Sequence, residues 1–156
     1  MSVVEHTIEV DVPVRVAYDQ WTQFESFPEF MEGVKRVVQQ GDKSLEWTAE
    51  IMGKENTWTA EIVEQVPDQR IAWRSTSGAP NAGIVSFQPT GDNATRVTLR
   101  IDAEPQDALE KAGDFLGFLD RQVKGDVERF KEYIEQRGVP SGAWRGEIRG
   151  GEVDRS

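Results

Sequence analysis

The alternation of apolar and polar residues over the middle of the chain is the feature that most constrains the fold. Between Val34 and Asp102 the pattern repeats every two residues, in runs at 34–39, 44–52, 55–65, 70–76, 83–89 and 95–102. A period of two is typical of strands that bury one face. Turn-forming Gly, Pro, Asn and Asp residues separate most of these runs over short distances, which favours hairpins. The middle of the chain is therefore predicted to be an antiparallel meander.

The period changes after the last of these runs. Over residues 106–138 apolar side chains recur every three or four positions, at Ala112, Leu116, Leu119, Val123, Val127, Phe130 and Ile134. This spacing predicts one long helix, which Gly138 and Pro140 end. The segment 139–156 is rich in glycine and charge and has no period, so we expect a disordered tail there. One domain, residues 1–138, accounts for the rest of the chain.

A strand and two short helices are predicted before the meander. Residues 3–11 alternate, a helix follows Pro13, and a second short helix follows Ser26, with Pro28 in its first turn. The whole order predicts an α+β fold, in which a curved antiparallel sheet of about seven strands wraps the C-terminal helix. The short helices interrupt the packing between the sheet and the long helix, so a pocket is expected there.

Composition excludes several classes of function. The chain has 28 acidic and 18 basic residues, a net charge of −10, which disfavours binding to nucleic acid or to an anionic membrane. It has no cysteine, a single histidine (His6) and no glycine-rich phosphate motif, so neither a metal nor a cofactor is expected. No signal peptide and no apolar run of about 18 residues is visible, so we expect a cytoplasmic protein without stable membrane insertion.

Three segments carry a resemblance to a known family. YDQWTQFESFPEFM at residues 18–31, RIAWRS at 70–75 and GIVSF at 83–87 resemble bacterial polyketide cyclase/dehydrase-like proteins of the START and birch-pollen-allergen (SRPBCC) superfamily. The most specific part is Trp-x-x-Phe-x-x-Phe-Pro-x-Phe, beginning at Trp21. The resemblance covers residues 1 to about 137 and implies a helix-grip fold with an internal cavity for a lipid, a quinone or a polyketide-like molecule.

The expected cavity lies under the tryptophans of the apolar sheet face. Trp47, Trp58 and Trp73 share that face, while the start of the long helix offers only small residues such as Gly113 and Gly117 against them. This mismatch leaves space for a ligand. The residues expected to contact it are Phe24, Phe27, Trp47, Ile51, Trp58, Ile62, Trp73, Phe87, Ala112, Leu116 and Leu119.

Three functions remain open at this point. The favoured one is binding or transport of a hydrophobic small molecule. The second is a polyketide aromatase/cyclase or dehydratase, in which the resemblance implies an inward arginine and hydroxyl groups; the candidates are Arg74, Ser75, Ser86 and Tyr18. Arg74 is expected on the polar side of its strand. It can point into the cavity only if the alternation of the two faces is interrupted at Trp73. The third is an interaction module with a filled core. The enzyme hypothesis predicts that an acid or an arginine points into the cavity and has a shifted pKa.

Overall fold

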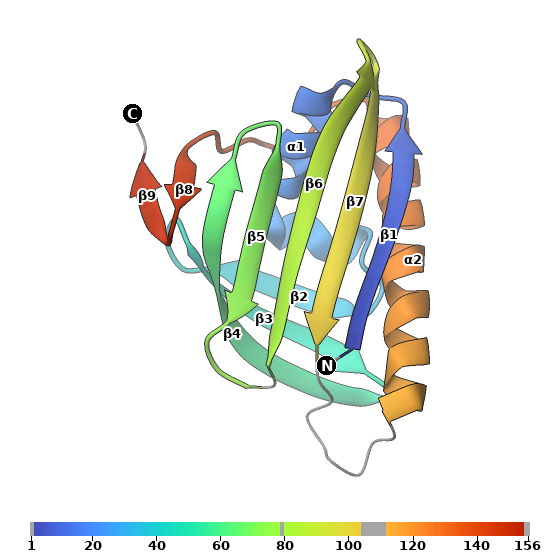
Figure 1. Ribbon diagram of the computed structural model, residues 1–156, viewed down its shortest axis with the longest axis vertical. Coiled ribbons are helices and arrows are strands. Elements are labelled where there is room, and N and C mark those ends of the chain that lie inside the picture. The colour runs from blue at the N-terminus through green and yellow to red at the C-terminus, as the bar shows by residue number, and fades with distance from the viewer. Residues whose placement is uncertain (1, 79, 104–111, 155–156) are drawn as a thin grey trace.

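A single curved antiparallel sheet holds the long C-terminal helix, as Figure 1 shows. The computed structural model describes residues 2–78, 80–103 and 112–154. The strands follow the order β1-β7-β6-β5-β4-β3-β2, and two short strands from the tail, β8 and β9, extend the sheet beside β4. The α+β helix-grip architecture predicted from the sequence is confirmed.

The elements follow the predicted order along the chain. They are β1 (Ser2–Val10), α1 (Val14–Trp21), the 3-10 helix η1 (Phe24–Glu29), β2 (Val34–Gln39), β3 (Ser44–Ile51), β4 (Lys54–Val66), β5 (Arg70–Ser75), β6 (Asn81–Gly91), β7 (Ala94–Ala103), α2 (Ala112–Arg137), β8 (Glu147–Arg149) and β9 (Glu152–Asp154). The first strand pairs with the last strand of the meander, β7. Part of the predicted long helix, residues 106–111, lies outside the described residues.

The second short helix begins earlier than predicted. It starts at Phe24 rather than after Ser26, because Ser26 N already donates to Gln23 O at 3.0 Å. Pro28 therefore lies near its end and not in its first turn. A short 3-10 helix needs few backbone hydrogen bonds, so the missing N–H of Pro28 is tolerated there.

Aromatic rings join the short helices to α2. The Trp21 ring lies 5.2 Å from Phe27, 5.7 Å from Phe30 and 5.2 Å from Phe130, measured between centroids. All four side chains are at most 2% exposed. The contacts with Phe27 and Phe30 are edge-to-face, a geometry that adds to the stabilisation from burial alone, and the contact with Phe130 is tilted. They fix α1 and η1 against the C-terminal half of α2.

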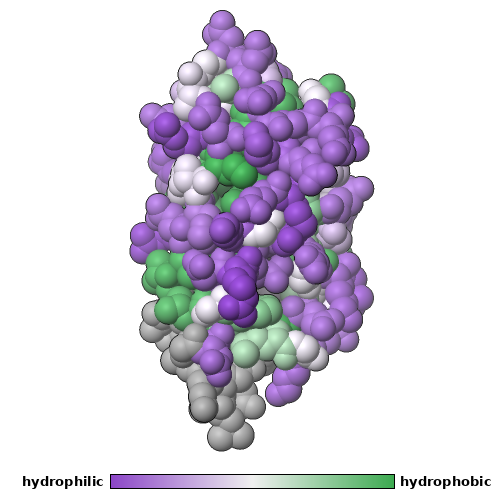
Figure 2. Space-filling view, turned by 90° about the vertical axis from the view of Figure 1, so that its right-hand side faces the viewer, coloured by the Kyte–Doolittle hydropathy of each residue, from purple (hydrophilic) through white to green (hydrophobic). Residues whose placement is uncertain are grey.

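The outer side of α2 is polar. The face of the molecule that Figure 2 presents, which is the right-hand side of Figure 1, carries mostly hydrophilic side chains. This is the distribution expected for an amphipathic helix with one buried stripe. In the part of the chain that the structure describes, no helix combines the length and apolar character needed to cross a membrane.

The tail differs from the sequence-based expectation of disorder. Residues 139–154 run across α1 and end in β8 and β9 beside β4 (Figure 1). The reason is an open strand edge: β3 begins only at Ser44, opposite Glu61, whereas β4 continues beyond Glu61 to Val66. The tail occupies this edge, where Gln65 pairs with Ile148, whose side chain is fully buried. Three-residue strands are too short to produce a visible period in the sequence.

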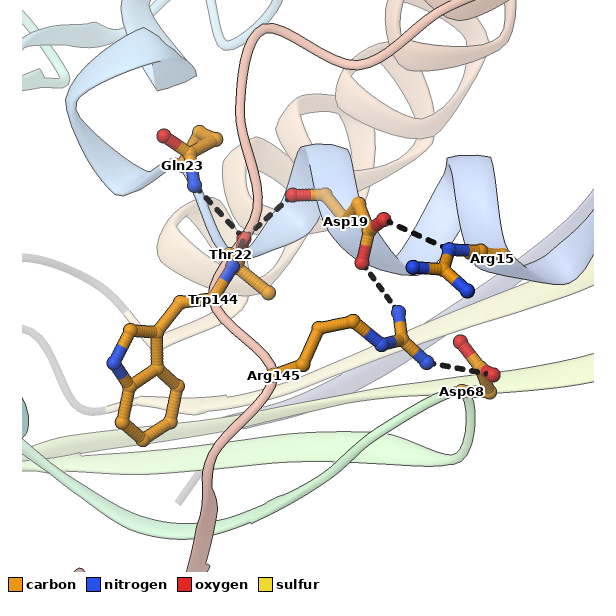
Figure 3. A network of polar contacts seen from close by, with 7 residues as sticks. All are labelled: Arg15, Asp19, Thr22, Gln23, Asp68, Trp144 and Arg145. Atoms are coloured by element: carbon orange, nitrogen blue, oxygen red, sulfur yellow. Dashed lines mark hydrogen bonds and ion pairs between the residues drawn. The ribbon is translucent and has the colours of Figure 1, made fainter. Parts of the chain in front are cut away.

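Arg145 holds the tail to the domain through two carboxylates (Figure 3). Its guanidinium pairs with Asp19 on α1 and, at 2.8 Å, with Asp68 in the turn between β4 and β5. Next to it, Trp144 N donates to Thr22 Oγ1 at 3.1 Å. The Asp19 side chain is only 7% exposed, and its other cation, Arg15, is 3.8 Å away. The negative charge of Asp19 is therefore compensated mainly by Arg145 of the tail.

We predict that Arg145→Ala lowers the free energy of unfolding by about 2–3 kcal/mol, because it leaves the Asp19 charge buried with a distant partner. Arg149→Ala is the matched control in the same tail: Arg149 is mostly exposed and pairs with Glu147, so its loss should change stability by less than about 0.5 kcal/mol. Urea unfolding followed by tryptophan fluorescence measures both. Equal effects would contradict the assigned role of Arg145.

Candidate functional site

A cavity of about 170 Å³ lies between the concave face of the sheet and the N-terminal half of α2. Its size is comparable to engineered cavities of about 150 Å³ that admit benzene. The sheet contributes mainly Trp47, Ala49, Ile51, Trp58, Trp73, Ala82, Leu99, Ile101 and Ala103; the helix contributes Phe115, Phe118, Leu119, Gln122, Val123 and Asp126; Met31, Gly33 and Val34 complete the wall beside Glu50, Asn56, Thr57 and Asn81. The lining is therefore largely apolar.

Three neighbouring indole rings form one wall of the cavity. Trp47 and Trp58 face each other across β3 and β4, with ring centroids 5.9 Å apart and planes within 4°. Trp73, on β5, lies 6.3 Å from Trp47 at 23°. Its cross-strand partner on β6 is Gly83, where an added Cβ would lie 2.4 Å from Trp73 Cζ2. Glycine at this position lets the Trp73 ring lie close against β6.

The helix side of the cavity differs from the predicted stripe. Leu116 was expected to face inward but is 41% exposed, whereas its neighbour Phe115 is 4% exposed and lines the cavity. A helix of period 3.6 can continue a stripe from Leu119 through either position, and burying the larger ring gains more. Gly117 does not pack against the sheet: a Cβ there would meet only Arg121 Nη1, at 3.5 Å.

One nearly buried acid interrupts the apolar lining. Asp126, on α2, is 7% exposed, and its Oδ1 accepts hydrogen bonds from Gln122 Nε2 at 3.2 Å and Arg129 Nη2 at 2.6 Å. Arg129 also pairs with Glu32 at 3.2 Å and donates to Phe30 O at 3.0 Å. Burial raises the pKa of Asp126 to about 6, outweighing the lowering effect of Arg129.

Asp126 was missed by the sequence analysis, although a signal was present. It lies three residues after Val123 and four before Phe130, so it occupies the apolar stripe of the helix. An acid inside such a stripe is unusual and points to a buried charge with a partner. The hydrogen bonds that reach it come from its own helix, at i−4 and i+3.

The structure brings together five of the residues expected to contact a ligand: Trp47, Ile51, Trp58, Trp73 and Leu119 line the cavity. Phe24, Phe27, Ile62 and Phe87 are buried in the core outside the cavity lining, and Leu116 is exposed. The side chain of Ala112 lies outside the described residues. The aromatic residues of the short helices thus pack the domain rather than the cavity.

The candidate catalytic residues do not line the cavity. Arg74 is exposed on the convex face of the sheet, because the alternation does not slip at Trp73; the irregularity lies in β4, between Ile62 and Glu64. Ser75 Oγ accepts a hydrogen bond from Asn81 N at 3.0 Å, and Ser86 lies on the convex side of β6. Tyr18 is fully buried beneath Arg145, and burial raises its pKa to about 12.

We predict that Asp126→Asn stabilises the protein at neutral pH. The pKa of Asp126 rises from its ordinary 3.8 to about 6 on folding, so its protonated form favours the folded state. That contribution is full below about pH 4 and is lost as the pH rises through 6. The variant should match the wild type near pH 4 and exceed its free energy of unfolding by on the order of 3 kcal/mol at pH 8.

Urea unfolding at pH 4 to 8 checks this prediction. The other groups near the carboxyl are Arg129 and Gln122 on α2 and Glu32 before β2, and all of them are present in both proteins. Glu128→Gln, at an exposed position of the same helix, is the control and should change stability by less than about 0.5 kcal/mol throughout. Parallel pH profiles for wild type and Asp126→Asn would contradict the assignment.

Known structures share this fold. A START superfamily protein from Mycobacterium smegmatis aligns with a TM-score of 0.68 and 16% identity over 88% of this chain and 97% of its own. The Zhui aromatase/cyclase from Streptomyces sp. R1128 aligns with a TM-score of 0.74 and 17% identity over 91% and 98%. A protein from Deinococcus radiodurans reaches 27% identity, with a TM-score of 0.71 over 88% and 99%.

Sequence comparison agrees with the structural comparison. An uncharacterized 17.2 kDa protein of Streptomyces lincolnensis is 50% identical over 149 residues, which cover 95% of this chain and 99% of that protein. Residues 10–132 match the family described as polyketide cyclase/dehydrase and lipid transport. This match covers most of the sheet and the larger part of α2. The chain therefore belongs to the polyketide cyclase/dehydrase and lipid transport family.

Proposed function

We propose that this protein binds a hydrophobic small molecule in the cavity between the sheet and α2. The observation that carries the proposal is an apolar space of about 170 Å³ with three neighbouring tryptophans in its wall. Protein interiors are close-packed, and empty apolar space forfeits dispersion contacts that a ligand would restore. The family description, which includes lipid transport, supports the same class of ligand.

The size of the cavity restricts the ligand. A space similar to one that admits benzene accommodates one aromatic ring with a short chain, or one end of a longer molecule. The interaction module with a filled core is disfavoured, because that alternative requires the space under Trp47, Trp58 and Trp73 to be packed. Ligand binding therefore occurs inside the domain rather than on its surface.

A polyketide cyclase or dehydratase is the second candidate, and one observation favours it. Asp126 is an inward acid, hydrogen-bonded at the cavity wall, with its pKa raised to about 6. An acid that titrates near neutral pH is suited to general acid–base catalysis. Because Arg74, Ser75 and Tyr18 are outside the cavity lining, proton transfer in this alternative falls to Asp126. Loss of turnover in Asp126→Asn with ligand binding retained would support catalysis.

The first test of ligand binding uses the protein purified from its host. Denaturation followed by mass spectrometry identifies any released small molecule, and the emptied protein is titrated with 2-phenylethanol and 1-decanol while tryptophan fluorescence is recorded. We expect saturable quenching, because Trp47, Trp58 and Trp73 line the cavity. Finding no co-purified molecule and no quenching by either probe would refute the proposal.

A pair of matched variants locates the binding. Ala49→Leu places a larger side chain in the cavity wall and should weaken 2-phenylethanol binding at least about tenfold. Ala72→Leu makes the same change on the convex face of β5, outside the cavity lining, and should leave affinity unchanged. Isothermal titration calorimetry measures both. Equal affinities in the two variants would show that the probe binds elsewhere.

A further inference from the structure

The charged residues of the cavity lining have one sign. Among the described residues that line it, only Glu50 and Asp126 carry ionisable carboxyl groups, and neither a lysine nor an arginine is present. The nearest cation of the Asp126 network, Arg129, is outside the lining and already pairs with Glu32. The chain as a whole has a net charge of −10. Both the local and the overall field therefore disfavour an anionic ligand.

The Asp126 carboxylate retains an acceptor for a ligand. Both of its hydrogen bonds, from Gln122 and Arg129, fall on Oδ1, and within the described part of the chain no donor reaches Oδ2. A carboxylate offers about four lone-pair sites, so two donors on one oxygen leave it under-satisfied. Its side chain is only 10% exposed, which limits compensation by water. A ligand that donates a hydrogen bond would complete its coordination.

The aromatic wall suits the apolar body of such a ligand. Indole rings offer large apolar surfaces against which another ring can pack. Trp47, Trp58 and Trp73 lie in one group, with neighbouring centroids 5.9 and 6.3 Å apart. An apolar body gains from burial beside these rings, while its ammonium group gains from Asp126.

We propose that the cavity selects an apolar ammonium ligand, a small hydrophobic amine whose charged end binds Asp126 and whose body lies beside the tryptophans. This inference rests on the proposed binding function and names its ligand class. The volume suits one ring and a short chain, as in an arylalkylamine. A carboxylate of the same shape is excluded, because it would add a second buried anion next to Asp126. A neutral alcohol binds more weakly than the amine.

Three probes with similar apolar bodies test the selectivity: 2-phenylethylamine, 2-phenylethanol and phenylacetate. Calorimetry at pH 7.5 should give an amine affinity at least about tenfold higher than that of the alcohol, with no detectable binding of phenylacetate. Asp126→Asn should lower the amine affinity at least about tenfold and leave the alcohol within about threefold. Glu128→Gln, the exposed control on the same helix, should leave all three affinities unchanged.

The outcomes separate this inference from the proposed function. If the alcohol binds as tightly as the amine, or if phenylacetate binds as well as either, the ligand selectivity is wrong while cavity binding stands. An unchanged amine affinity in Asp126→Asn also overturns the inference. If none of the three probes binds to folded wild-type protein, both proposals fail. The unfolding curve of each variant establishes that it is folded.

Discussion

The packing of Trp21 against the rings around it is the contact on which the rest of the structure depends. Trp21, Phe27, Phe30 and Phe130 join α1, η1 and the C-terminal half of α2 in one buried cluster. Because these rings fill one end of the space inside the curved sheet, α2 is held there. At the other end the N-terminal half of the helix stays in contact with β1, where His6 Nε2 lies 2.8 Å from Asp120 Oδ1, and the cavity separates it from the strands that carry the three tryptophans. The space between the sheet and α2 is therefore packed with rings at the C-terminal end of the helix and contains the cavity at its N-terminal end.

The open end combines an apolar wall with an acid that is costly to bury. The hydrogen-bond donors to Asp126, Gln122 and Arg129, both lie on α2. Arg129 also pairs with Glu32 and donates to Phe30 O. This arrangement positions the acid without placing a cation in the cavity lining. Both candidate functions use the Asp126 carboxyl. In a binding protein it accepts a hydrogen bond from the ligand, whereas in a cyclase or dehydratase it transfers a proton.

The C-terminal segment is part of the domain, although it follows the matched family region, residues 10–132. It occupies the edge of β4 that β3 leaves open, and Arg145 compensates carboxylates on two elements distant in sequence. Under it lie Tyr18 and Gln65, both nearly inaccessible to solvent. The segment therefore shields Tyr18 and Gln65 from solvent and stabilises the end of the fold opposite the cavity.

The sequence by itself determined the strands, the long helix and their order, because periods of two and of 3.6 are local consequences of burying one side of each element. It also placed Trp47, Trp58 and Trp73 on one face. Only the tertiary structure decided that Phe115 rather than Leu116 faces inward, that Asp126 lines the cavity, and that the tail pairs with β4. These features depend on where distant elements meet. A three-residue strand has no period that could reveal its pairing, and the position of Asp126 in the apolar stripe of the helix indicates burial but not that a cavity lies beside it.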